Sequence, residues 1–147
     1  MAGMTNIPET PETPDTPIGP DSSAPALPLL IVDGANVVGS VPDGWWRDRR
    51  GAAERLRDRL VAYAASGTAE LPGPLELVLV VEGAARGVAS VPGVRVAEAP
   101  GSGDDRIVEL AGEAAGRTCL VVTADRELRR RVTALGAGVT GPRAVLG

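Results

Sequence analysis

The sequence predicts a doubly wound α/β domain, in which a parallel sheet is covered by helices on both faces. Short runs that are apolar at every position alternate with longer stretches in which apolar residues recur at helical spacing. Uninterrupted apolar runs are typical of strands buried on both faces, whereas strands with one wet face alternate apolar and polar residues. A chain of 147 residues with 44% hydrophobic residues suits one such domain.

Residues 1–28 do not follow this alternation. They repeat an acidic-Thr-Pro unit over 9–17 and contain few apolar residues. Such a segment cannot bury enough surface to offset the entropy that is lost on ordering. We therefore expect a disordered tail over 1–28 and a single folded domain over 29–147.

The folded part divides into alternating strands and helices. The first strand ends at Asp33, Gly67 stops the first helix, and Ser102 opens the second. The expected elements are a strand at 29–32, a loop up to 46, a helix at 47–66, strands at 75–81 and 94–97, a helix from 102 to 116, a strand at 119–122, a helix at 125–135 and a short last strand near 138–140. The link between the second and third strands is short for a parallel crossover. Either this link is tight or the third strand is marginal.

The chain contains no His and a single Cys, Cys119. The lack of His excludes Ser-His-Asp and Cys-His triads, His-based acid–base chemistry and His-ligated zinc or iron. One Cys excludes a disulfide framework and a Cys-based zinc site, and its place in an apolar run indicates a structural core thiol. If the protein is an enzyme, carboxylates must carry most of the chemistry.

The formal net charge of −4 arises in the tail, whose acids have no basic counterparts. The rest of the chain has as many Arg as Asp plus Glu, so it neither requires nor excludes nucleic acid. The sequence begins without a signal-peptide pattern and contains no apolar run long enough to cross a bilayer. We expect a soluble, cytoplasmic protein with no membrane partner.

Acidic residues follow several of the predicted strands. Asp33 comes after the first strand, Glu82 after the second and Asp125 after the fourth, while Asp104 and Asp105 open the helix that leads into the fourth. In an open parallel sheet, ligands bind beyond the carboxyl ends of the strands. Carboxylates that converge there repel one another unless a hard cation such as Mg²⁺ or Mn²⁺ binds among them. Such an ion can promote phosphodiester hydrolysis without His.

Each of these acids also has a structural interpretation. Ser102 and Asp105 have the spacing of a helix capping box, and Asp125 could be the N-cap of its helix. Asp33 could belong to a turn, and Glu82 could be a loop residue. Several acids fall at the strand ends that the fold predicts, in a chain without other catalytic residue types. Their joint placement favours the functional interpretation.

Three short motifs carry a resemblance to a known family. They are VDGANVVG at 32–39, GDD at 103–105 and VTADREL at 122–128. In this order they resemble NYN domains of the YacP-like branch, which are relatives of PIN nucleases, and the resemblance extends over nearly all of 29–146.

The resemblance implies a three-layer PIN-like domain with strand order 3-2-1-4-5 and an endoribonuclease activity that depends on Mg²⁺ or Mn²⁺. It implies that Asp33 is the first metal ligand, that Asn36 orients it, that Asp104 or Asp105 is the central acid and that Asp125 is the acid after the fourth strand. Relatives often carry Asp near the position of Glu82, whose longer side chain leaves its role open. The catalytic residues expected are Asp33, Asn36, Asp104, Asp105 and Asp125, with Asp33, Asp105 and Asp125 as metal ligands.

Aromatic and basic residues follow two of these motifs. Trp45 and Trp46 are adjacent, so both side chains cannot point into the core, and the one left outside could stack on an unpaired base. Arginines after them, and others on one face of the third helix, could hold phosphates, although both groups could equally be solvated surface. The expected substrate contacts are Trp46, Arg47, Arg50, Arg126, Arg129 and Arg130.

The most specific functional hypothesis is a metal-dependent endoribonuclease that hydrolyses RNA phosphodiesters at the carboxylate cluster. RNA is the expected partner, and the ribosome or other RNA-processing factors are further candidates. One alternative is an RNA-binding module of nuclease fold that does not cut. Another is a nucleotide phosphohydrolase, which would use the same metal site with a nucleoside pocket and would not need the arginine surfaces. A pure interaction module is the remaining alternative.

Overall fold

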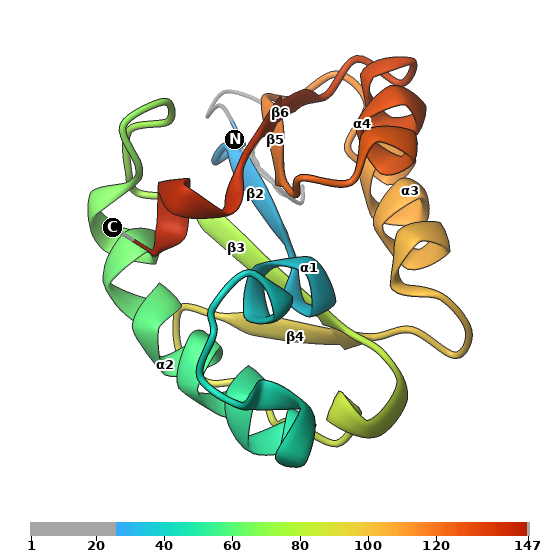
Figure 1. The fold of residues 1–147 in the computed structure, drawn as a ribbon. Helices are drawn as coiled ribbons and strands as arrows, with labels where there is room; N and C mark the ends of the chain where they lie inside the picture. The colour runs from blue at the N-terminus through green and yellow to red at the C-terminus, as the bar shows by residue number, and fades with distance from the viewer. Residues whose placement is uncertain (1–25, 147) are drawn as a thin grey trace, which may run out of the picture.

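The computed structural model describes residues 26–146 and contains a five-stranded, all-parallel sheet (Figure 1). The sheet order is β4-β3-β2-β5-β6, which is 3-2-1-4-5 when its strands are counted along the chain, as predicted. Of the tail expected over 1–28, residues 1–25 lie outside the described residues. The strands are β2 (Leu29–Asp33), β3 (Glu76–Val81), β4 (Arg95–Glu98), β5 (Cys119–Val122) and β6 (Gly138–Thr140).

Helices cover both faces of the sheet and make a three-layer domain. On one face, α1 (Gly34–Gly39) and α2 (Arg49–Ser66) pack against each other and against β3. On the other, α3 (Gly103–Glu113) and α4 (Arg126–Thr133) pack together, with α3 over β2 and β3 (Figure 1). The predicted α/β class and layer arrangement are confirmed.

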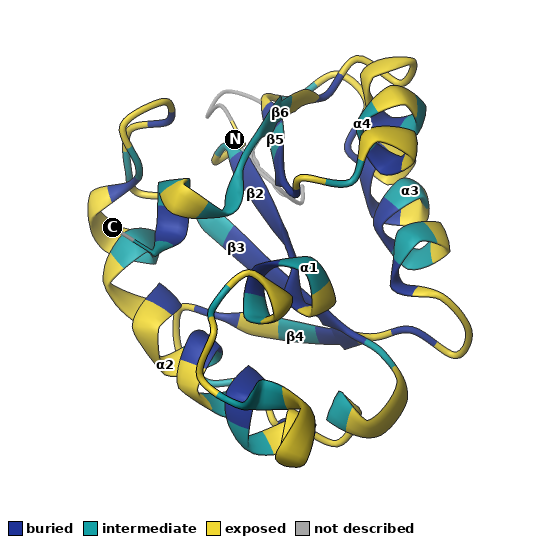
Figure 2. Ribbon diagram, in the orientation of Figure 1, coloured by how far each residue is buried: buried dark blue, intermediate teal, exposed yellow. Residues whose placement is uncertain are grey.

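Two hydrophobic cores lie on the two faces, and alternate residues of the strands feed each of them. Ile31 contributes to the core beneath α3 and α4, whereas Leu30 and Val32 contribute to the core beneath α1 and α2. All three side chains are fully buried. Figure 2 shows the inner strands dark blue and the outer sides of the helices yellow. Double-sided burial explains why these strands are apolar at every position.

Cys119 is the buried thiol expected from its apolar surroundings. Burial raises its pKa, so the thiol stays protonated. In the described part of the chain, no helix is both long and apolar enough to cross a membrane.

The register of the sheet brings the strand ends together at one edge. Asp33 is opposite Val80, and Val32 is opposite Val122. The residues that follow β2, β3 and β5 therefore lie along the same carboxyl edge. At this edge the chain enters α1 at Gly34, after β2, and α4 at Arg126, after β5.

Two parts of the sequence prediction were wrong or incomplete. The segment after Asp33, expected as a loop, contains α1 and a 3₁₀ turn, η2 (Trp45–Arg47). A helix as short as α1 shows no apolar periodicity, and its start depends on the Asp33 cap. The short link after β3 holds only a 3₁₀ turn, η3 (Gly83–Ala85), and a bridge between Val91 and Val94, so the crossover is tight and leads into the short edge strand β4.

Candidate active site

Asp33 is the last residue of β2 and the N-cap of α1, and only 5% of it is exposed. Its Oδ1 accepts a hydrogen bond from Asn36 N at 3.3 Å, and its Oδ2 accepts one from Thr123 Oγ at 2.8 Å. Burial raises the pKa of Asp33 to about 6, although both hydrogen bonds oppose the shift, and the charges of Asp104 and Glu82 raise it further. Burial therefore destabilises the ionised carboxylate, and a cation bound beside it would offset this cost.

Thr123 and Asn36 connect the end of β5 to the start of α1. Thr123 is fully buried, and its hydroxyl oxygen also accepts a hydrogen bond from Asp125 N at 3.1 Å. Asn36 Oδ1 accepts a hydrogen bond from Ala124 N at 2.8 Å. Thr123 had no role in the sequence prediction, yet a hydroxyl residue directly after an apolar strand next to β2 is a signal that could have identified it.

Asp125 has the capping role that the sequence also allowed. Its Oδ1 accepts a hydrogen bond from Leu128 N at 2.9 Å, which makes it the N-cap of α4. The side chain is half-buried beside Thr123. Capping engages one oxygen, so it is compatible with a second role for the other.

The two acids that open α3 have different surroundings. Asp105 is exposed, and its Oδ1 lies 3.0 Å from Arg131 Nη2 in an ion pair. Asp104 is half-buried. Partial burial raises its pKa most, the charges of Asp125 and Glu82 add to the rise, and Arg131 opposes it. Asp104 is therefore the acid of this pair that shares the electrostatic environment of Asp33.

Glu82 fixes the start of α3. Its Oε1 accepts a hydrogen bond from Gly103 N at 2.5 Å. A Cβ at position 103 would meet this same oxygen, so any larger residue there would displace the Glu82 side chain from its present position. Ser102 Oγ accepts from Asp105 N at 3.2 Å, which is one half of the capping box that the sequence suggested, whereas the Asp105 carboxylate pairs with Arg131. These two contacts satisfy two of the free amides at the helix start.

The donor set suits a hard cation. Asp33, Asp104, Asp125 and Glu82 supply only oxygen ligands. The charges of Asp104 and Glu82 contribute to the raised pKa of Asp33, and those of Asp125 and Glu82 contribute to the raised pKa of Asp104. Within residues 26–146, no three acidic or thiol side chains lie close enough to bind one metal ion together. Mg²⁺ usually keeps several waters and needs only one or two carboxylates, so this spacing fits an ion of that kind.

Aromatic and basic residues flank this edge near the start of α2. Trp45 and Trp46 pack edge to face with ring centroids 6.1 Å apart, and 56% of Trp46 is exposed. The guanidinium carbon of Arg47 lies 5.6 Å from the Trp46 ring centroid, and that of Arg49 lies 5.1 Å from Trp45. Arg50 is exposed in the first turn of α2.

A second basic group lies at the start of α4. Arg126 is exposed beside the Asp125 cap, and the exposed Arg130 pairs with Glu127 at 2.8 Å. Arg129 is half-buried and donates from Nε to the carbonyl oxygen of Thr123 at 2.8 Å. Of these arginines, Arg129 supports the site from within, while the other two face solvent.

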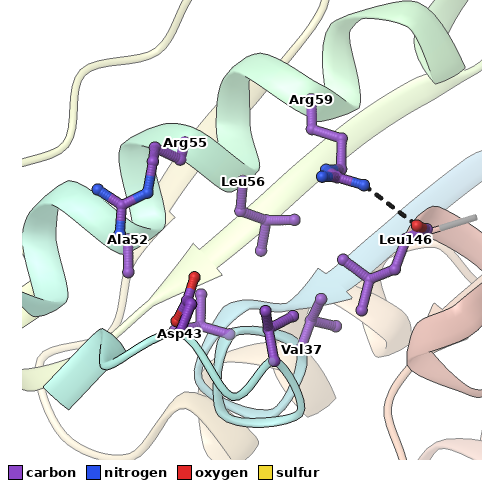
Figure 3. Close-up of a pocket in the computed structure, with 9 residues that line it drawn as sticks. Val37, Asp43, Ala52, Arg55, Leu56, Arg59 and Leu146 are labelled. Atoms are coloured by element: carbon purple, nitrogen blue, oxygen red, sulfur yellow. Dashed lines mark hydrogen bonds between the residues drawn. The ribbon is translucent and has the colours of Figure 1, made fainter.

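A cavity of about 210 Å³ lies apart from the acids, between α1, α2 and the C-terminal segment (Figure 3). Val37 and Leu56 form part of its apolar lining, and Asp43 points into it. Arg59 Nη1 donates to the carbonyl oxygen of Leu146 at 3.1 Å across one end. None of the acids of the candidate site lines this cavity.

Solved structures share this architecture. A crystal structure of Rae1 (YacP) from Bacillus subtilis matches with a TM-score of 0.62 and 21% identity, covering 80% of this chain and 71% of that one. The chain has a YacP-like fold. A tryptophan-to-leucine mutant of Rae1 matches with a TM-score of 0.63 and 19% identity, covering 82% of this chain and 73% of the mutant. No protein-family model and no curated protein matches the sequence.

Proposed function

We propose that this chain is a metal-dependent endoribonuclease of the YacP-like NYN branch, hydrolysing RNA phosphodiesters at the carboxyl edge of its sheet. The observation that carries the proposal is the buried Asp33, whose pKa of about 6 reflects burial together with the charges of Asp104 and Glu82. The fold supports it, because the solved structures that share it bear the name of the branch that the sequence motifs resemble. The absence of His leaves carboxylates as the candidate catalytic groups.

The Mg²⁺ or Mn²⁺ ion would bind among Asp33, Asp104 and Asp125. One or two of these carboxylates would be direct ligands and the remainder would act through bound water, because no three acids of residues 26–146 lie close enough to bind one ion together. The bound ion would supply activation of water and neutralisation of charge on a phosphoryl oxygen. The family resemblance left the central acid as Asp104 or Asp105, and the expected ligand Asp105 remains a prediction. We prefer Asp104, because Asp105 is exposed and pairs with Arg131.

The residues around the acids would position them and the substrate. Thr123 holds one oxygen of Asp33, and Asn36 ties α1 to the end of β5 through Ala124 N. This bracing fixes the carboxylate before substrate arrives, which is the kind of preorganisation that catalysis needs. The solvent-facing arginines, Arg47, Arg50, Arg126 and Arg130, would contact phosphates along the strand, with Trp46 as an exposed stacking surface.

Incubation with labelled RNA tests the proposal. Single-stranded RNA, structured RNA and ribosome-associated RNA are each incubated with Mn²⁺, with Mg²⁺ and with chelator. We expect internal cleavage that requires the divalent ion and is lost in Asp33→Asn, while Asp105→Asn retains it. Undiminished cleavage in chelator would refute the metal mechanism. RNA binding without cleavage would indicate the non-cutting module, and hydrolysis of free nucleotides alone would indicate the phosphohydrolase.

A further inference from the structure

A small cavity lies directly beside the candidate active site. It opens between the start of α1, the start of α2 and the turn that follows β3, and it measures about 70 Å³. Gly34, the residue after Asp33, lines one side, and Glu82 lines another. The cavity therefore adjoins the acids that would act on a phosphodiester.

Small apolar groups and one aromatic ring line this cavity. Ala35, Ala53 and Ala85 contribute only methyl groups to the lining, and two valines complete its apolar part. Trp45 supplies the aromatic wall, and the Arg49 guanidinium lies over its ring with 5.1 Å to the centroid. An aromatic ring, a stacked guanidinium and small apolar groups together suit a flat, uncharged heterocycle.

We propose that this cavity binds one unpaired nucleobase of the RNA strand, an inference that rests on the proposed function. Because a cavity of about 70 Å³ is smaller than a whole nucleobase, the base would enter with one edge and rest against Trp45 at the open mouth, while the attached sugar and phosphate remain outside at the Asp33 edge. A base held in a duplex cannot enter, because its faces and edge are occupied by its neighbours. The substrate would then be an RNA that is single-stranded, or locally unpaired, at this nucleotide.

The assignment changes which tryptophan contacts the base in the cavity. Trp46 is the more exposed of the pair but is not part of this lining, whereas Trp45 is. A Trp46→Phe variant therefore leaves Trp45 as the sole tryptophan and a direct fluorescent reporter of the cavity. The probe is a single-stranded RNA hexanucleotide, used at low salt with chelator so that it is not cut.

In the Trp46→Phe background we expect the hexanucleotide to quench Trp45 fluorescence, and the same sequence in a duplex to leave it unchanged. Ala85→Leu should fill the cavity and weaken hexanucleotide binding by about fivefold or more. A fivefold loss corresponds to the lower end of the effect of one stacked base. Ala84→Leu is the matched control, because Ala84 is exposed in the same 3₁₀ turn and does not line the cavity. It should change binding little.

A set of hexanucleotides with one abasic position each tests the same point without altering the cavity. Quenching should disappear for one position of the abasic site and persist for the others. If the intact strand binds by anisotropy without quenching Trp45, or if Ala85→Leu and Ala84→Leu bind alike with unchanged melting temperatures, the base cavity is refuted while the proposed function stands. If the wild-type protein binds no RNA at all, the proposed function fails and the cavity proposal fails with it.

Discussion

Thr123 donates a hydrogen bond from Oγ to Asp33 Oδ2 at 2.8 Å, linking the ends of two neighbouring strands that are far apart in the sequence. The same hydroxyl oxygen accepts from Asp125 N. One side chain thus connects the first acid of the candidate site with the backbone of the last. The position of the Asp33 carboxylate therefore depends on this threonine as well as on the neighbouring acids.

Thr123→Val should loosen the site while keeping the shape of the side chain. Removing the donor leaves the buried Asp33 carboxylate one hydrogen bond short, so its pKa should rise above the wild-type value of about 6. We expect a loss of unfolding free energy of about 1–3 kcal/mol above that pKa. Urea melts near neutral pH measure the loss. Thr123→Ser should restore most of it, and equal losses in both variants would show that the hydroxyl is not the cause.

The raised pKa of Asp33 predicts how stability depends on pH in the metal-free protein. Its pKa is about 6 in the folded state against 3.8 for the unperturbed group, so the folded state binds the proton more tightly. Stability from this group is therefore fullest below the lower value and falls as pH rises toward and through about 6. The full effect is about 3 kcal/mol.

Asp33→Asn isolates this contribution, because Asn can still cap α1 but does not titrate. The difference in unfolding free energy between mutant and wild type should shift in favour of the mutant by about 3 kcal/mol between acidic and neutral pH. Denaturant melts of both proteins across that range, in chelator, provide the measurement. A difference that stays constant with pH would mean that Asp33 titrates normally.

Variants of Glu82 test whether this residue positions the start of α3 or binds the metal ion directly. Glu82→Gln keeps an oxygen that can accept from Gly103 N, whereas Glu82→Ala leaves that amide without its partner. We expect Glu82→Ala to lower the unfolding free energy by about 1–2 kcal/mol and Glu82→Gln to lower it less. Metal affinity, measured by calorimetry, should likewise fall more in Glu82→Ala than in Glu82→Gln. If Glu82 is instead a ligand, Glu82→Gln should lose as much affinity as Glu82→Ala.

The solvent-facing arginines of α4 predict the salt dependence of RNA binding. Arg126→Gln combined with Arg130→Gln should weaken binding and reduce the slope of log affinity against log salt by roughly 1–2, because fewer counterions are released. Arg95→Gln is the control, since Arg95 is exposed at the start of β4, away from the carboxyl edge. If the slope of the double variant equals that of the control, this face of α4 is only solvated surface.

Much of the architecture followed from the sequence. Strands that are apolar throughout, such as the one ending at Asp33, required cover on both faces, and alternation with helices required parallel pairing. The acids at the strand ends could therefore be placed on one edge from the sequence. Asp125 and Ser102 also have the capping contacts that their positions suggested.

Other features depend on contacts that one-dimensional patterns do not reveal. The inward turn of Arg129 toward the Thr123 carbonyl cannot be inferred from its helical face alone. The Glu82 contact with Gly103 joins the turn after β3 to the start of α3, and only the folded chain brings the two together. The choice between Asp104 and Asp105 likewise depends on Arg131, which lies on a different helix.

The most direct test of the central claim is the melting temperature of the wild type, Asp33→Asn, Asp104→Asn and Asp105→Asn, each with chelator and with Mg²⁺. If the acids bind the ion, Mg²⁺ at about ten times its dissociation constant should stabilise the wild type by about 1.4 kcal/mol, or a few degrees. Asp33→Asn and Asp104→Asn should lose this rise, and Asp105→Asn should keep it. A rise that persists in Asp33→Asn would contradict the proposed metal site.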